Sequence, residues 1–311
     1  MIEQNFCSAR LKPTFMDGVF MEKIKPWLGN PAATMDIVKK YGIYAKKKFG
    51  QNFLVDTHVL ERIVDAAELT GDDFVLEIGP GIGTLTQYLA YNAGRVLAVE
   101  IDKSLLDVLN ETTSGYDNVE ILNEDILKVD LTKIAETMND GKPIKIAANL
   151  PYYITTPIIM GILESGASVS SMTFMVQKEV AERMAAKPGG KDYGALSLAV
   201  QYYCETELNA NVPPNCFMPR PEVYSAVITL KPRAEKIKVS DEKLMFKLIK
   251  AAFSQRRKTL SNCLRNSPEF RFSKEQAVEL LGKAGLDINI RGEALSLDAY
   301  AHITDILKNI M

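Results

Sequence analysis

Histidine is nearly absent from this chain of 311 residues, whose two histidines are His58 and His302. Two histidines far apart in the sequence argue against a histidine-based catalytic triad or metal site. Cysteine is also scarce, and the four cysteines lack the close spacing of a metal site or a disulfide framework. They are Cys7, Cys204, Cys216 and Cys263. We expect reduced, mostly buried thiols and no metal, so the chemistry must depend on other groups.

Long apolar runs are missing too. No stretch of eighteen or more apolar residues exists, which excludes a membrane span. The first forty residues contain no continuous apolar stretch of the signal-peptide type, so we expect a cytoplasmic protein. With 47% hydrophobic residues, the chain can still bury a substantial core. Its length suggests one large domain and a smaller one.

An excess of positive charge is also missing, since the net charge is −2, but the charge is unevenly distributed. Five lysines and no acidic residue lie between Ile37 and Val55. Four lysines, three arginines and again no acidic residue lie between Lys243 and Arg265. One such segment would be typical of a solvated face. Two of them in an otherwise acidic chain favour contacts with the phosphate groups of a nucleic acid.

Periodicity divides the chain into three parts. Residues 1–35 have turn-forming residues without a sustained period, which predicts an irregular extension. Residues 36–235 alternate strand and helix patterns, which predicts a parallel sheet with helices on both faces. Residues 236–311 are helical throughout, which predicts a small all-α C-terminal domain. The predicted strands are 74–78, 95–101, 119–122, 144–148, 169–176 and 225–230; the predicted helices are 56–69, 85–91, 103–110, 177–186, 244–264, 274–284 and 297–310; 196–203 is either.

The first of these strands runs into a glycine-rich turn, residues 79–83 (GPGIG). A strand, a glycine turn and a helix start give a ligand close access to the backbone and to unpaired N–H groups. Thr84 stands where the dinucleotide fingerprint has glycine or alanine, and Pro80 removes an amide donor that a pyrophosphate would use. A nucleoside cofactor without phosphates fits better, and the inferred cofactor is S-adenosylmethionine.

Acidic residues stand at or just after the ends of the next two strands. Glu100 lies about twenty residues beyond the glycines, where a carboxylate can bind a ribose diol in doubly wound folds. Asp125 comes just after the third strand and is placed to meet an adenine amino group. For Asp102 we expect the simpler role of capping the next helix.

A turn of sequence Asn-Leu-Pro-Tyr, residues 149–152, follows the fourth strand, at the sheet edge where such folds bind ligands. An exocyclic adenine amine is a poor nucleophile because its lone pair is delocalised into the ring. The Asn149 side-chain oxygen and the Leu150 carbonyl would accept its two hydrogens, favour a pyramidal nitrogen and stabilise the developing positive charge. Pro151 would stiffen the turn and Tyr152 would offer a ring to the base. Asn-x-Pro also occurs in ordinary turns, so the order of the motifs along the chain carries the argument.

Four segments together resemble the ribosomal RNA adenine dimethyltransferases, most closely their small-subunit (kasugamycin-sensitivity) branch. The segments are 47–54 (KKFGQNFL), 77–81 (EIGPG), 149–152 (NLPY) and 217–223 (FMPRPEV), and the resemblance runs from about Tyr41 to the C-terminus. It implies a Rossmann-like class I S-adenosylmethionine-dependent methyltransferase domain that acts as a monomer. The implied reaction is dimethylation of the N6 amines of two adjacent adenosines near the 3′ end of 16S rRNA, within the assembling 30S particle.

The resemblance also implies roles for single residues, such as a Phe217 ring that stacks on the target base opposite Tyr152. The predicted catalytic residues are Asn149, Leu150, Pro151, Tyr152 and Phe217. The predicted cofactor-binding residues are Gln51, Asn52, Leu54, Glu77, Gly79, Gly81, Glu100, Ile101, Asp125, Ile126 and Asn149. The predicted RNA-binding residues are Lys46, Lys47, Lys48, Arg220, Arg256, Arg257 and Lys258.

Two other functions stay open at this point. The erythromycin-resistance methylases dimethylate an adenine of large-subunit rRNA with similar motifs, although the FGQNFL run, Leu150 and the long helical C-terminal part favour the small-subunit enzymes. A non-catalytic ribosome assembly factor would keep the fold, but it would have no need of four intact residues: Asn149, Tyr152, Glu100 and Asp125. The extension before about Asp36 departs from the short start that is usual in the family.

Overall fold

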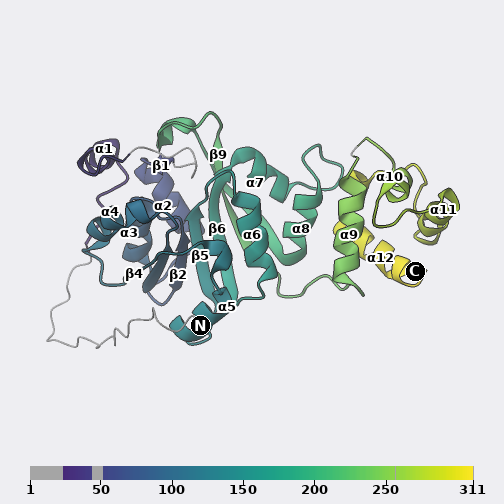
Figure 1. Ribbon diagram of the computed structural model, residues 1–311, viewed down its shortest axis with the longest axis horizontal. Helices are drawn as coiled ribbons and strands as arrows, with labels where there is room; N and C mark the ends of the chain where they lie inside the picture. The colour runs from purple at the N-terminus through teal and green to yellow at the C-terminus, as the bar shows by residue number, and fades with distance from the viewer. Residues whose placement is uncertain (1–23, 44–51, 256, 311) are drawn as a thin grey trace.

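The structure is a computed structural model that describes residues 24–43, 52–255 and 257–310 (Figure 1). Its centre is a seven-stranded sheet in the order β4-β3-β2-β5-β6-β9-β7. The strands are β2 (Phe74–Ile78), β3 (Arg95–Val99), β4 (Val119–Leu122), β5 (Ile144–Asn149), β6 (Val169–Gln177), β7 (Cys204–Val212) and β9 (Ser225–Pro232). β2 to β6 pair in parallel, and β9 is antiparallel to both β6 and β7. The chain order reverses between β2 and β5, which is where such sheets bind ligands.

Helices cover both faces of this sheet because its central strands are buried on both sides. All five residues of β2 are buried. Phe74, Leu76 and Ile78 join one core cluster, which packs α5 (Leu131–Met138), α6 (Thr155–Glu164) and α7 (Lys178–Ala185) against the sheet. Val75 points to the other face and joins the cluster of α2 (Thr57–Ala66) and α3 (Thr84–Asn92). The continuous apolar run of the strand therefore reflects a two-sided burial, as in other α/β proteins.

The predicted parallel sheet is wrong at one edge. Antiparallel β9 lies between β6 and β7, and the sequence patterns did not predict β7 at all. β7 is an edge strand whose residues are mostly exposed or half-buried, so it lacks the apolar run by which the central strands were predicted. The segment 196–203, left open above, lies in helix α8 (Ala195–Tyr203). The patterns also missed α5 and α6.

Four helices follow the sheet and form one end of the molecule (Figure 1): α9 (Glu242–Phe253), α10 (Leu260–Asn266), α11 (Lys274–Lys283) and α12 (Leu297–Lys308). The prediction of one helix over 244–264 is wrong, because α9 ends at Phe253 and the Thr259 side chain caps a new helix. Leu198 and Tyr202 of α8 belong to the core cluster of these helices, so the two parts share buried residues. The division into domains at 35/36 and 235/236 stays a prediction.

A helix also occupies part of the predicted irregular extension. α1 (Pro31–Lys40) begins after Asn30, whose side chain accepts a hydrogen bond from the Ala33 N–H, and proline stands at its first position. Leu28 and Ile37 bury their side chains in a small cluster with Phe53. Residues 24–40, the N-terminal arm, are therefore packed on the sheet domain.

Candidate active site

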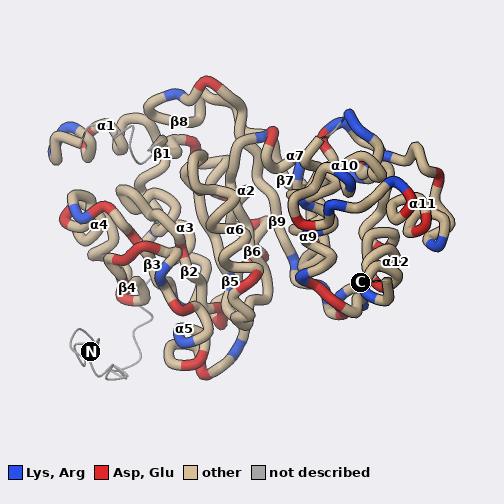
Figure 2. Tube along the Cα trace, turned by 45° about the vertical axis from the view of Figure 1, so that its right-hand side comes forward, with Lys and Arg blue, Asp and Glu red and all other residues tan. Residues whose placement is uncertain are grey.

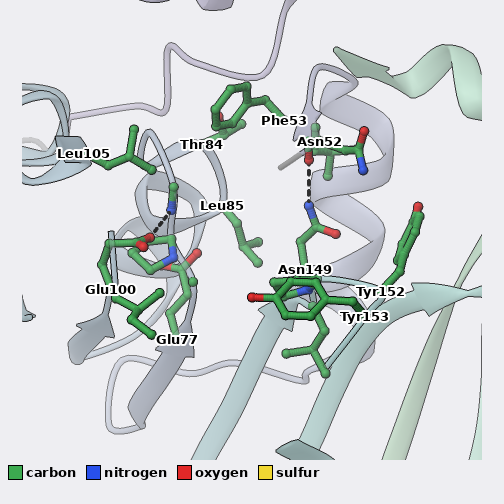
Figure 3. Close-up of a pocket in the computed structure, with 17 residues that line it drawn as sticks. Asn52, Phe53, Glu77, Thr84, Leu85, Glu100, Leu105, Asn149, Tyr152 and Tyr153 are labelled. Atoms are coloured by element: carbon green, nitrogen blue, oxygen red, sulfur yellow. Dashed lines mark hydrogen bonds between the residues drawn. The ribbon is translucent and has the colours of Figure 1, made fainter. Parts of the chain in front are cut away.

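One cavity opens at the carboxyl ends of β2, β3 and β5, the place where the topology predicts a ligand site (Figure 3). Four stretches of chain contribute lining residues: 52–54, 77–85, 100–105 and 149–153. The lining residues are Asn52, Phe53, Leu54, Glu77, Gly79, Pro80, Gly81, Thr84, Leu85, Glu100, Ile101, Leu105, Asn149, Leu150, Pro151, Tyr152 and Tyr153. Residues distant in the sequence thus meet in one place.

The glycine turn between β2 and α3 requires glycine for conformational and steric reasons. Gly79, Gly81 and Gly83 all have positive φ, at 66°, 62° and 86°. A Cβ on Gly83 would also lie 2.6 Å from the Thr112 hydroxyl oxygen. The turn therefore brings its backbone up to the cavity in a path that other residues would strain.

Glu100 fixes the glycine turn to the end of β3. Its carboxylate accepts hydrogen bonds from the Gly81 N–H at 3.0 Å and from the Asp102 N–H at 2.8 Å. Burial raises the pKa of Glu100, and these two N–H donors oppose the shift. Asp102 itself accepts from the Ser104 N–H and caps the following 3₁₀ turn, η2 (Lys103–Leu105), so its predicted capping role is confirmed.

Glu77 places a second carboxyl group in the cavity wall. The side chain is 1% exposed, and its Oε2 has no hydrogen-bond partner among the residues that the structure describes. Burial raises the pKa of Glu77 to about 8, and the negative charge of Glu100 adds to that shift. A buried, unpaired carboxyl oxygen is costly. A ligand with a cationic or hydrogen-donating group would therefore stabilise this part of the cavity.

The turn after β5 presents two free oxygen acceptors. Asn149 Nδ2 donates to the Asn52 carbonyl at 3.2 Å, which fixes the orientation of the amide (Figure 3). The Asn149 Oδ1 accepts no hydrogen bond from the part of the chain that the structure describes. Leu150 N–H donates to the Met175 carbonyl of β6 at 3.0 Å, while the Leu150 carbonyl accepts from no described residue. Two neighbouring acceptors are held in place, and a substrate amine has two hydrogens to donate.

Tyr152 and Phe217, the two predicted stacking residues, lie in different surroundings. The Tyr152 ring lines the cavity, and its hydroxyl pairs with the Ser225 hydroxyl at 2.6 Å. Phe217 lies in β8 (Phe217–Met218), which pairs with β1 (Phe53–Leu54), and its ring is 3% exposed in the core. The structure therefore brings Tyr152 to the cavity but not Phe217.

Asp125 and Ile126 are also absent from the cavity lining. Asp125 caps the 3₁₀ turn η3 (Ile126–Lys128) by accepting from the Leu127 N–H at 3.1 Å. The other predicted cofactor residues that the structure describes do line the cavity. Sequence reasoning missed Phe53, Pro80, Thr84, Leu85, Leu105 and Tyr153 as lining residues. All of them lie within five residues of a predicted cofactor-binding or catalytic residue. Closeness in the sequence to those residues is the one signal by which they could have been predicted.

Several predicted residues lie outside the described residues: Lys46, Lys47, Lys48, Gln51 and Arg256. Arg220, Arg257 and Lys258 are described, and all three are exposed. Figure 2 shows lysine and arginine gathered over α9 and α10, at the end formed by the C-terminal helices. Within residues 24–43, 52–255 and 257–310, no group of three metal-ligating side chains is found. None of the described helices is both long and apolar enough to span a membrane.

The sheet order, with a glycine turn and an acid-ended strand at the switch point, defines a Rossmann-like methyltransferase. The chain belongs to the ribosomal RNA adenine dimethylase family, whose model matches residues 43–309. This confirms the resemblance found in the four sequence motifs.

Relatives are similar over nearly their whole length. A ribosomal RNA small subunit methyltransferase A from Lachnoclostridium phytofermentans is 58% identical, over 92% of this chain and 99% of that protein. One from Alkaliphilus metalliredigens is 52% identical, over 88% and 96%.

Solved structures agree with the fold. A dimethyladenosine transferase from Plasmodium falciparum is 25% identical with a TM-score of 0.68, over 81% of this chain and 95% of that one. The 23S rRNA methyltransferase ErmE is 28% identical with a TM-score of 0.63, over 83% and 100%.

Proposed function

We propose that this protein transfers methyl groups from S-adenosylmethionine to the N6 amines of two adjacent adenosines near the 3′ end of small-subunit rRNA, within the assembling 30S particle. The observation that carries the proposal is the pair of free acceptors, Asn149 Oδ1 and the Leu150 carbonyl, in one cavity with the buried Glu77 and Glu100. The named relatives are small subunit methyltransferases, which supports this choice of RNA.

The cavity fits a cationic nucleoside cofactor. Glu77 offers an unpaired buried carboxyl oxygen, and Glu100 stands at the end of β3, where a ribose diol is bound in related folds. The glycine turn gives a close approach to backbone groups. When bound, S-adenosylmethionine supplies an electrophilic methyl group and its own leaving group. Asp125 and Ile126 are proposed to reach its adenine, next to the cavity rather than in the present lining.

The chain's own residues would activate and orient the adenine amine. Asn149 Oδ1 and the Leu150 carbonyl accept its two N–H groups, which localises the nitrogen lone pair and aims it into the cavity. These hydrogen bonds strengthen as the nitrogen becomes positive, so they favour the transition state over the bound substrate. The methylated nitrogen then loses one proton to water, and in the second transfer its remaining N–H donates to one of the two acceptors. Holding the amine in line with the methyl group supplies much of the remaining rate enhancement.

The Tyr152 ring is proposed to stack on the target base, which must leave its helix to reach the cavity. The hydroxyl pair with Ser225 fixes the ring in place beforehand. Phe217 is proposed as the second stacking residue. Because its ring is buried against β1, this role requires the short β1–β8 ladder to open when RNA binds.

The first test is methyl incorporation from labelled S-adenosylmethionine into undermethylated ribosomal particles, with primer extension to locate the sites. We expect stops at two adjacent adenines near the 3′ end of small-subunit rRNA. Asn149→Ala should lower the rate by about 10²- to 10³-fold, as expected for loss of one transition-state acceptor. Asn110→Ala, at an exposed position of α4 (Leu106–Thr113), is the matched control and should be active.

Two results would contradict this proposal. A stop in large-subunit rRNA alone would assign the protein to the resistance type. RNA binding without methyl incorporation into either RNA would leave an assembly factor that does not catalyse methylation.

A further inference from the structure

Tyr153 combines two features that rarely coincide. Its side chain is 58% exposed, one of the most exposed large hydrophobic residues of the described chain, yet it lines the candidate active site. It directly follows Tyr152, whose hydroxyl is held by Ser225. Figure 3 shows the Tyr153 ring extending across the cavity mouth toward the Glu100 side, away from the Tyr152 ring. The two neighbouring tyrosines therefore serve different sides of the cavity.

We propose that Tyr153 is a further cofactor-binding residue, whose ring covers the adenosyl group of a nucleoside cofactor in this cavity. The inference rests on the proposed function, because it takes the cofactor to be S-adenosylmethionine. It adds a residue to the cofactor site that neither the motifs nor the sheet topology predicts.

The position of Ile101 supports an adenosyl ligand. Ile101 follows Glu100, lines the same cavity and is 49% exposed. An aromatic ring and a branched aliphatic side chain at one cavity mouth leave apolar surface in water, which costs free energy. A purine is planar and has apolar faces, so its binding would remove surface of both side chains from water. Aromatic side chains stack on purines without reading their edges.

The hydroxyl end of Tyr153 points to the same part of the ligand. Burial raises the pKa of Tyr153, and the negative charges of Asp125 and then Glu100 raise it further. The hydroxyl therefore keeps its proton as a hydrogen-bond donor near the two acids predicted to hold adenine and ribose. Figure 3 shows the hydroxyl directed toward the Glu100 side of the cavity, where the ribose is proposed to bind.

Tyr224 provides a matched control on the same protein. It is 56% exposed, nearly the same as Tyr153, and it precedes β9 outside the cavity lining. If exposed tyrosines served only as a platform for RNA bases, the two residues would behave alike. If the inference holds, Tyr153 alone affects the cofactor.

The test measures binding of S-adenosylhomocysteine to the full chain by calorimetry. We expect Tyr153→Ala to weaken binding about tenfold, equal to about 1.4 kcal/mol. Tyr153→Phe keeps the ring and should weaken it less than about threefold, and Tyr224→Ala should leave it unchanged. The KM for S-adenosylmethionine should rise in Tyr153→Ala, while kcat at saturation stays close to wild type.

The possible failures are distinguishable. Wild-type affinity for S-adenosylhomocysteine in Tyr153→Ala would overturn the inference and leave the proposed function intact. Weakened binding of rRNA with unchanged affinity for S-adenosylhomocysteine would also overturn it, and would assign the ring to the RNA surface. A wild-type protein that binds no S-adenosylhomocysteine would overturn the proposed function and this inference together.

Discussion

Single residues set the electrostatics of the cavity, and Glu77 is the clearest case. Its carboxyl group is buried, one of its oxygens has no partner in the described part of the chain, and burial raises its pKa to about 8. The free protein therefore holds Glu77 mostly protonated at neutral pH. A cationic ligand would favour the ionised form of Glu77, so we expect ligand binding at about pH 7 to release the Glu77 proton.

This raised pKa predicts a pH-dependent stability. The unfolded chain loses the Glu77 proton near the ordinary value of 4.5, while the folded chain holds it to about 8. Between these values the folded state binds more protons, so the free energy of unfolding falls as pH rises. The contribution is present below about pH 4.5 and is lost, on the order of a few kcal/mol, by about pH 8.

Glu77→Gln should remove this dependence, because the amide does not titrate. Urea unfolding of both proteins from pH 5 to pH 9 checks it: the variant should gain stability over wild type steadily as pH rises. Glu136→Gln, at an exposed position of α5, is the control and should show no such gain. A difference between wild type and Glu77→Gln that stays constant with pH would show that the carboxyl group has an ordinary pKa.

The residues of the site differ in how far the sequence could predict them. Glu100 and Asn149 each come where a buried strand ends, and the carboxyl ends of parallel strands meet at one edge, so their meeting follows from periodicity. Phe217 could be placed by motif alone, and a motif does not report that its ring packs under β1. Tyr153 could not be predicted as a lining residue, because the side of the cavity that a turn residue faces depends on the three-dimensional structure.

At the scale of elements, the N-terminal arm supports the cavity from behind. Leu28 and Ile37 pack in one cluster with Phe53 and Leu105, and the latter two line the cavity. Local signals for α1 existed, namely Asn30 as cap and Pro31 as first residue. The turn-forming residues before them led to the prediction of an irregular segment. The contacts that stabilise the arm come from Phe53 and Leu105, which are distant in the sequence and could not be predicted from local patterns.

Gln87 of α3 is the main polar anchor of this arm. Its side chain is fully buried; Oε1 accepts from the Trp27 and Leu28 N–H groups, both at 3.0 Å, and Nε2 donates to the Thr112 carbonyl at 2.8 Å. Gln87→Leu would leave these backbone groups without partners, at a cost of roughly 1–3 kcal/mol each where they stay buried. The arm should therefore detach before the sheet unfolds.

Amide hydrogen exchange of residues 24–40 measures this, because the Trp27 and Leu28 N–H groups are the two that Gln87 binds. We expect Gln87→Leu to raise the exchange rates of these residues while the far-ultraviolet circular dichroism stays near wild type. Gln276→Leu, in the exposed cap of α11, should leave these rates unchanged. Wild-type exchange rates in Gln87→Leu would mean that apolar contacts alone hold the arm.

At the scale of the whole molecule, the helical end is fixed to the sheet by a polar contact. Glu242, at the start of α9, accepts from the Tyr203 hydroxyl at 2.6 Å and from the Tyr202 hydroxyl at 3.1 Å, both on α8. Tyr193 reaches the same end by donating to the Leu295 carbonyl at 2.9 Å. The basic surface over α9 and α10 therefore has a fixed orientation relative to the cavity, as positioning of a large RNA requires.

That basic surface should carry phosphate contacts that place the RNA without choosing the base. Arg257 and Lys258 are exposed, and neither forms an ion pair with a described residue. Each phosphate contact contributes about 0.7–0.9 to the slope of log affinity against log salt. Replacing both by alanine should weaken binding to undermethylated 30S particles and lower that slope by roughly 1.4–1.8. Adding Arg256→Ala, at a position outside the described residues, should lower it further.

The control for this experiment removes two positive charges at positions outside the basic surface. Lys128→Ala with Lys142→Ala removes two lysines that flank α5 in the sequence, outside the C-terminal helices, and should leave the salt slope unchanged. Affinity for S-adenosylhomocysteine should be wild type in both variants, because none of these side chains lines the cavity. An unchanged slope in the Arg257 and Lys258 variant would mean that the net-negative molecule binds its RNA through another surface, with the lysines before β1 as the next candidates.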